Sequence, residues 1–177
     1  GKLMEELGIL PLGDIRQCLI TLASENPLTD LFRYRFEHAS LSGHNLGNLL
    51  IAATERMTGG LEQALDQLEK VLGIKGKIFP VTLENANIKA VLNNNEEIER
   101  EEAIINCRYL SKVGIKNLFL TPEVKANPKA ISAIKKADLI IIGPGKFYTS
   151  LIPNLLTDGI VDAIRQSKAK KIFICNL

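Results

Sequence analysis

The order of hydrophobic and polar residues divides the chain into a helical first part, residues 1–73, and a strand-rich second part, residues 74–177. Apolar residues of the first part recur at helical spacing, which predicts helices over 14–23, 28–36, 42–58 and 61–72. The last of these has the clearest stripe, made by Leu61, Ala64, Leu65, Leu68 and Leu72. We interpret both parts as one domain, 1–177.

The second part changes to the shorter apolar runs that are typical of strands, at 77–81, 88–92 and 116–120. The acidic segment 96–102 between them reads as a solvated face or loop. From Pro128 onward the pattern alternates: helix 129–136, strand 139–142, helix 160–166, strand 172–175. A strand–helix–strand order requires a right-handed parallel crossover, so the pattern predicts an α/β fold.

The strand at 139–142 is β-branched and nearly uncharged, and we expect it to be buried on both faces of a parallel sheet. It runs into a glycine-rich turn and then a short helix, the place where open α/β proteins bind ligands. The candidate binding residues of this loop are Gly143, Pro144, Gly145, Lys146, Tyr148, Thr149 and Ser150. An ordinary strand-to-helix turn is the alternative, and the four hydrogen-bonding side chains favour the ligand site.

The helix predicted from Ser42 to Gly59 begins with a second polar cluster. Ser42 is the expected cap, and we predict that His44, Asn45 and Asn48 share the first turn and line a site. Gly47 costs a helix interior about 1 kcal/mol relative to alanine, which indicates that another backbone or a ligand approaches it closely. The expected core stripe of this helix is Leu46, Leu49, Leu50, Ala53 and Met57.

Composition narrows the classes of partner. A net charge of +2 without a dense lysine and arginine block argues against a nucleic-acid partner, and no apolar run approaches the roughly 20 residues of a membrane span. Three cysteines without a paired motif indicate a reduced, cytoplasmic compartment. Cys18 and Cys175 read as small core residues, and Asp14 as the N-cap of the first predicted helix.

Three motifs in one order resemble a known family. They are Leu7-Gly8-Ile9-Leu10-Pro11 with Gly13-Asp14-Ile15-Arg16, then Ser42-Gly43-His44-Asn45-Leu46-Gly47-Asn48, then Gly143-Pro144-Gly145 with Tyr148-Thr149-Ser150. The chain resembles the bacterial gluconeogenesis factors, which are related to the 2-phospho-L-lactate transferases of deazaflavin-coenzyme biosynthesis. The resemblance implies a three-layer α/β/α, Rossmann-like, mostly parallel sheet with helical additions in the N-terminal half.

The resemblance also implies a function: binding of a nucleotide or nucleotide sugar, a uridine-diphosphate sugar in the bacterial branch, in support of carbon metabolism and cell-envelope growth. The loop at 143–150 and the helix start at 42–48 would line that cleft. The alternative is a Mg²⁺-dependent transferase, with Asp14 as its catalytic or metal-binding residue. The third hypothesis, a purely structural or interaction domain, is ranked below these two. A second copy of the chain, as a homodimer, stays an open alternative among the partners.

The chain departs from the family pattern at several points. The glycine-rich phosphate strand expected upstream of residue 1 and a segment expected after Leu177 are absent, so we expect an incomplete chain. Lys146 stands where a small serine is expected, and Leu12 where proline is usual. Lys146 either adds a charge for a phosphate or points to water.

Overall fold

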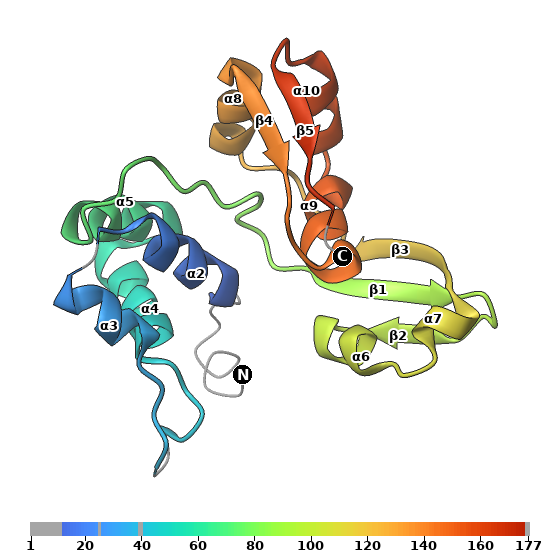
Figure 1. The fold of residues 1–177 in the computed structure, drawn as a ribbon, viewed down its shortest axis with the longest axis horizontal. Coiled ribbons are helices and arrows are strands. Elements are labelled where there is room, and N and C mark those ends of the chain that lie inside the picture. The colour runs from blue at the N-terminus through green and yellow to red at the C-terminus, as the bar shows by residue number, and fades with distance from the viewer. Residues whose placement is uncertain (1–11, 25, 39–40, 176–177) are drawn as a thin grey trace. The chain divides into compact units, whose positions relative to one another are not determined.

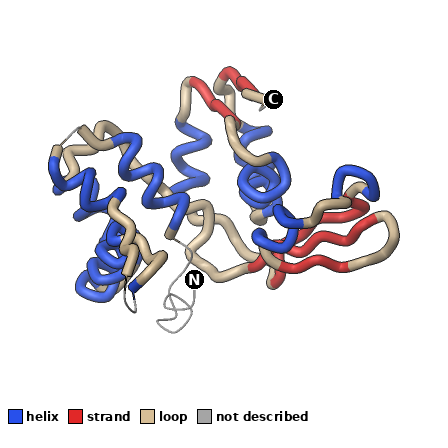
Figure 2. Tube along the Cα trace, turned by 60° about the horizontal axis from the view of Figure 1, so that its bottom comes forward, coloured by secondary structure: helices blue, strands red, loops and turns tan. Residues whose placement is uncertain are grey.

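The computed structural model describes residues 12–24, 26–38 and 41–175, which fall into two compact units that divide after Pro80. We call the first the helical unit and the second the strand unit (Figure 1). Among the described residues, the helical unit contains no strand, and the strand unit holds both sheets (Figure 2). The boundary lies seven residues beyond the one that the hydrophobic pattern suggests. No described helix is long and apolar enough to cross a membrane.

The described part of the helical unit is built from four helices: α2 (Gly13–Leu22), α3 (Pro27–Arg33), α4 (Leu46–Thr58) and α5 (Leu61–Val71). The predicted stripe of α5 is confirmed, because all five of its residues are buried. Asn26 caps α3, with its Oδ1 accepting hydrogen bonds from the N–H groups of Leu28 and Thr29. The core of the unit is contributed by all four helices: Leu12, Leu19, Ile20, Phe32, Ile51, Ala52, Leu61, Leu65, Leu68 and Leu72.

The predicted core stripe of α4 is wrong. Met57 is 80% exposed, whereas Gly47, Ile51 and Ala52 are buried. The reason is the approach of α3, whose backbone at Phe32 rests against Gly47 and so turns the glycine side of α4 inward. The expectation that Cys18 belongs to the core is wrong as well, because α2 packs through Leu12, Leu19 and Ile20 and leaves Cys18 exposed.

The strand predicted at 77–81 is absent, and residues 77–80 follow α5 as irregular chain. A hydrogen bond to a side chain holds this segment in place, and not pairing with a neighbouring strand. Glu69, only 5% exposed, accepts hydrogen bonds from the Ile78 N–H and from the Lys77 ammonium, both at 2.7 Å. Asp66 accepts a further hydrogen bond from Lys77 at 2.8 Å.

The strand unit begins with an antiparallel sheet of order β2–β1–β3, formed by β1 (Asn87–Leu92), β2 (Glu97–Glu99) and β3 (Ile115–Thr121). The short helices α6 (Glu101–Asn106) and α7 (Leu110–Val113) lie between β2 and β3 in the sequence. The acidic segment is therefore a strand and the start of a helix, so the loop alternative is wrong, whereas the solvated-face alternative is confirmed because its glutamates are exposed. Ile98 is buried while Glu97 and Glu99 are exposed, and both carboxylates pair with Lys89 across the strands.

The predicted alternation after Pro128 is confirmed. Helix α8 (Pro128–Lys136) leads into β4 (Leu139–Ile142), and α9 (Ile152–Leu156) and α10 (Ile160–Gln166) lead into β5 (Lys170–Phe173). Strands β4 and β5 are parallel, with Ile141 beside Ile172. The α/β fold class is thus confirmed by the parallel pair and its helical crossover.

One expectation about this pair is wrong: β4 is not buried on both faces. Leu139 and Ile141 are 46% and 54% exposed, and the neighbouring Ile172 is 48% exposed. Ile140 and Ile142, which point to the other face, are half-buried. Because alternate residues of a strand point to opposite faces, one face of β4 is half-buried and the other is open, while every residue of β5 is exposed within the described residues.

Candidate functional site

The loop after β4 is shaped by Gly143, which has a φ of +91°. A β-carbon at this position would lie 2.6 Å from the carbonyl oxygen of Ile174, in the chain that continues β5. Only glycine combines that backbone conformation with that approach. Gly143 therefore lets the loop leave β4 while the parallel pairing continues, with the Ile174 N–H donating to the carbonyl of Ile142 at 2.9 Å.

The loop then forms a π-helical turn, Phe147–Leu151, that leads directly into α9. The carbonyl of Lys146 accepts hydrogen bonds from the N–H groups of both Ser150 and Leu151, at 2.8 and 3.1 Å. Asn154 donates from its side-chain amide to the carbonyl of Ser150 at 2.7 Å and so ties the turn to α9. Single π-helical turns are uncommon and often occur at functional sites.

A pocket of about 220 Å³ opens beside this turn. It lies beyond the carboxyl ends of β4 and β5, the edge where α/β sheets bind ligands. The loop contributes Gly145, Lys146, Phe147 and Leu151, and the end of β5 contributes Phe173 and Cys175. At this volume the pocket can receive one part of a ligand, such as a ring or a phosphoryl group, since pockets for whole drug-sized ligands start near 300 Å³.

The predicted loop residues lie in different environments around this pocket. Gly145 and Lys146 line it, and Lys146 and Tyr148 are exposed. Tyr148 stacks edge-on against Phe147, with ring centroids 5.1 Å apart. Thr149 is half-buried, and its hydroxyl has no hydrogen-bond partner. A buried hydroxyl without a partner is costly, and a ligand at this turn would remove that cost.

The sequence interpretation missed two lining residues, Phe173 and Cys175. Cys175 was expected in the core, and that expectation is wrong, because the residue is exposed. The signal that could have identified them is positional: Phe173 ends β5 and Cys175 follows it, and the ends of adjacent parallel strands meet at one edge of a sheet.

The polar cluster before α4 differs from its prediction. The cap is Asn45 and not Ser42, because α4 begins at Leu46. Asn45 is 4% exposed; its Oδ1 accepts from the Asn48 N–H, and its amide donates to the carbonyl of Arg33. Ser42 donates its hydroxyl to the carbonyl of Glu37 at 3.0 Å. Both side chains thus hold the turn in shape.

Only Asn48 of the predicted first-turn residues lies inside α4, while His44 precedes the helix and is half-buried. The side-chain oxygen of Asn48 is buried without a partner. The close approach predicted at Gly47 is confirmed, and the approaching group is a backbone, that of Phe32. That His44 and Asn48 contact a ligand stays a prediction, as does the expectation that this turn and the loop at 143–150 line one cleft.

Asp14 is exposed in the first turn of α2, where Leu12, not Asp14, occupies the cap position. Although the Cys18 side chain is exposed, partial desolvation of its thiol is the larger cause that raises its pKa, and the nearby Asp14 carboxylate is the second. No cluster of three or more His, Cys, Asp or Glu side chains suited to a metal ion exists among residues 12–24, 26–38 and 41–175. Mg²⁺ in phosphate-binding sites is held by one or two carboxylates together with substrate phosphates, so the binding of Mg²⁺ by Asp14 stays a prediction.

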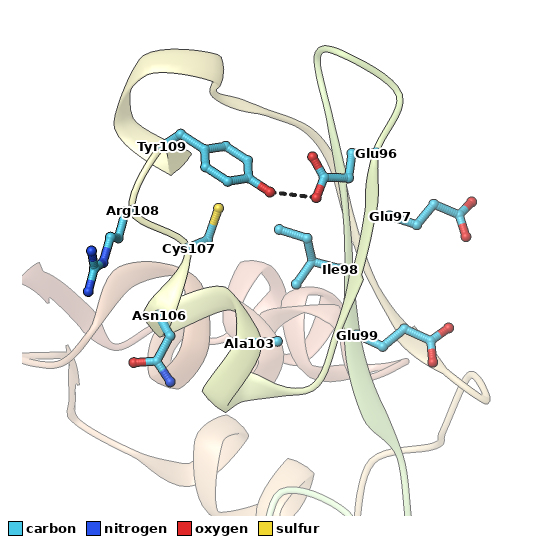
Figure 3. Close-up of a pocket in the computed structure, with 9 residues that line it drawn as sticks. All are labelled: Glu96, Glu97, Ile98, Glu99, Ala103, Asn106, Cys107, Arg108 and Tyr109. Carbon is cyan, nitrogen blue, oxygen red and sulfur yellow. Dashed lines mark hydrogen bonds between the residues drawn. The ribbon is translucent and has the colours of Figure 1, made fainter.

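A second hollow, of about 550 Å³, lies between β2 and the segment that follows α6, and none of the predicted site residues lines it (Figure 3). The Tyr109 hydroxyl donates to Glu96 at 2.5 Å, and this hydrogen bond and burial raise the pKa of Tyr109 to about 12. Glu97 and Glu99 point away from Tyr109 and pair with Lys89. This hollow is open to solvent. Its tyrosine and its three glutamates already have partners within the chain, so they are less available to bind a ligand.

Comparisons with known proteins agree in one family. The family model described as 2-phospho-L-lactate transferase CofD matches residues 1–177. Proteins named gluconeogenesis factor from Bacillus subtilis and Halalkalibacterium halodurans are 42% and 41% identical to the chain over 182 residues. A Nostoc sp. protein is 46% identical over 180 residues. Each alignment covers 100% of this chain, but only 56%, 55% and 39% of those proteins.

The fold comparison gives the same result. A crystal structure of a protein from Bacillus halodurans matches with a TM-score of 0.92 at 40% sequence identity, covering 100% of this chain and 57% of that protein. The chain thus spans about half the length of the relatives that it matches.

Proposed function

Because the chain belongs to the 2-phospho-L-lactate transferase CofD family, we propose that it is part of a cytoplasmic gluconeogenesis-factor protein that binds a uridine-diphosphate sugar. The similar proteins from Bacillus subtilis and Halalkalibacterium halodurans are named gluconeogenesis factors. The observation that carries it is the pocket beyond the carboxyl ends of β4 and β5, which Gly145 and Lys146 line.

The chemistry of the loop suits such a ligand. The Lys146 ammonium supplies a positive charge for a phosphoryl oxygen, and the unpartnered Thr149 hydroxyl supplies a donor and an acceptor for polar ligand groups. The ring of Phe147, 51% exposed, offers an apolar surface for a base or sugar ring. These groups bind and orient; none of them is a metal ligand or a paired acid and base.

The test is the thermal stability of the full-length protein that contains this chain. A saturating uridine-diphosphate sugar, at about 100 times its Kd, should raise the Tm by about 5 to 10 °C, and guanosine diphosphate should raise it less. Lys146→Gln should reduce the shift, while Lys136→Gln, at an exposed position at the end of α8, should not. If neither nucleotide at millimolar concentration raised the Tm, the proposal that the protein binds a nucleotide would be wrong.

A Mg²⁺-dependent transfer reaction is the second candidate, and its support is the family description itself. Turnover would have to be abolished by removal of divalent cations and by Asp14→Asn. The exposed position of Asp14 without a clustered set of metal ligands gives this candidate less support than the binding function.

A further inference from the structure

Positive charge is concentrated at the amino ends of β4 and β5, within the strand unit. Short links join α8 to β4 and α10 to β5, so the C-terminal ends of both helices lie there. Leu139 and Lys170 begin the two strands as cross-strand partners, and the Lys170 N–H donates to the carbonyl of Asp138 at 3.2 Å. This edge is opposite to the one that holds the pocket at Gly145 (Figure 1).

Basic side chains at this edge outnumber acidic ones. The basic residues lie in the last turn of α8 or between the end of α10 and the start of β5, and all are exposed: Lys135, Lys136, Arg165, Lys168, Lys170 and Lys171. The acidic residue of these segments is Asp138, which is exposed as well. The edge is therefore strongly positive, although the whole chain has a net charge of only +2.

The fold itself uses several of these charges. Three of them lie in the last turns of α8 and α10, where cations stabilise helix ends. Lys171 donates to the carbonyls of Ser167 and Ala169, at 2.7 and 3.2 Å. Lys168 and Lys170 lie beyond the helix and make no ion pair or side-chain hydrogen bond within residues 12–24, 26–38 and 41–175. These two ammonium groups are the ones available to a partner.

Leu139 provides an apolar contact beside Lys170. Its side chain is 46% exposed, and residues in register on adjacent strands project to the same face. Ile141 and Ile172, the next pair on this face, are exposed as well. A partner that matches this edge therefore carries carboxylates for the lysines and an apolar side chain for Leu139.

This combination favours a protein over other anionic macromolecules. A phosphate backbone offers charge but no apolar side chain, and no aromatic residue that could stack on a base lies within residues 135–139 or 165–172. An anionic bilayer is matched by a helix with an apolar outer face, and no large apolar side chain of α8 or α10 is exposed.

We propose that the edge formed by Lys168, Lys170 and Leu139 is a docking surface for an acidic segment of another protein, whose carboxylates pair with the two lysines. The surface and the ligand pocket lie at opposite edges of the same strand pair, so the two can be occupied independently. Salt screens the attraction between exposed charges, so binding should weaken as the ionic strength rises.

The first measurement tests whether the surface is accessible in the full-length protein. Acetic anhydride, read out by mass spectrometry, should modify Lys168 and Lys170 as readily as Lys112, which is also exposed. Protection of both lysines in the free protein would show that another part of the full-length chain covers them, and would overturn the docking surface.

The second measurement is the binding of a fluorescent glutamate-rich peptide that contains one leucine, followed by anisotropy with the full-length protein. Reversal of both charges, Lys168→Glu with Lys170→Glu, should weaken binding by at least about tenfold. The matched control, Arg108→Glu with Lys112→Glu, changes the net charge equally at exposed positions elsewhere in the strand unit and should change binding by less than about twofold. If the reversed variant did not fold, Lys168→Gln with Lys170→Gln gives the same test with a smaller expected loss.

The remaining outcomes decide the class of partner. The reversed variant should gain binding of a lysine-rich peptide of the same length, because the sign of the surface has changed. An equal loss of binding in the control variant would show that net charge and not this surface attracts the peptide. Tighter binding of oligothymidylate or of anionic lipid vesicles than of the glutamate-rich peptide would overturn the acidic protein partner, as would no binding of any probe.

Discussion

The carbonyl oxygen of Phe32 lies 2.6 Å from the point that a β-carbon on Gly47 would occupy. This backbone crossing of α3 and α4 fixes the orientation of α4, because it directs Gly47, Ile51 and Ala52 inward. The end of α3 also holds the turn at 43–48, since the Leu46 N–H donates to the carbonyl of Tyr34 at 2.9 Å and the Asn45 amide donates to the carbonyl of Arg33 at 3.1 Å. A glycine that is unfavourable for the helix thereby sets how closely α3 and α4 pack.

The first prediction concerns this contact. Gly47→Ala should destabilise the protein, because its methyl group would overlap the Phe32 carbonyl and the Arg16 Cδ. Overpacking against backbone costs about 1 to 3 kcal/mol, which exceeds the gain of about 1 kcal/mol in helix propensity. Chemical denaturation measures the difference. Gly13→Ala is the control, since no atom lies within 4 Å of its added methyl group, and its free energy of unfolding should stay the same or rise.

The second prediction concerns Glu69, the buried carboxylate that holds residues 77–78. Glu69→Ala leaves the Ile78 N–H and the Lys77 ammonium without this acceptor, and should lower the free energy of unfolding by about 1 to 3 kcal/mol. Asp66→Ala removes an exposed partner of the same lysine and should cost about 1 kcal/mol or less. Equal losses for the two variants would show that burial of Glu69 is unimportant.

The third prediction is a pH dependence. The hydrogen bond to Glu96 raises the pKa of Tyr109 from 10.0 to about 12, so the folded state binds this proton more tightly than the unfolded state does. The stabilisation is complete below pH 10 and should be lost as the pH rises from 10 through 12. Ultraviolet titration of the phenolate should show one late tyrosine, which Tyr109→Phe removes and Glu96→Gln shifts back toward 10. An unchanged late titration in Glu96→Gln would assign the shift to another group.

The fourth prediction concerns the unpartnered hydroxyl of Thr149. Thr149→Val removes a buried polar group that has no partner, so the free protein should keep or gain stability, by up to about 1 kcal/mol. The stabilisation by a uridine-diphosphate sugar should decrease. Thr157→Val provides the contrast, because the Thr157 hydroxyl donates to the carbonyl of Pro153 at 3.2 Å, and its loss should cost about 1 kcal/mol. A destabilised Thr149→Val protein would indicate a structural role instead.

Much of the fold follows from local pattern. Helix α5, the strands β1, β3 and β4, and the βαβ order after Pro128 were predictable because each has its own period, and each is bounded by glycine, proline or asparagine. The close approach of another group to Gly47 was also predictable, since a glycine inside a helix is unfavourable unless a neighbouring group occupies the space of the missing side chain. The glycine turn after β4 was predictable as well, as the exit from a parallel strand.

Other features depend on contacts between residues that are distant in the sequence. The choice of Asn45 over Ser42 as cap depends on where α3 and its carbonyl at Arg33 lie. The short β2 depends on pairing with β1, where Lys89 pairs with both Glu97 and Glu99 and offsets part of their mutual repulsion.

The sequence by itself determined the α/β class, the glycine positions and the family, because these depend on local propensity and on the order of motifs. Only the tertiary structure decided which polar groups are left for a ligand. Asn45 and Ser42 are used by the turn, whereas Thr149, Asn48 and Arg16 keep unpaired atoms. The physical reason is that a hydrogen-bonding group is available only after the backbone has taken its partners, and the fold sets those partners.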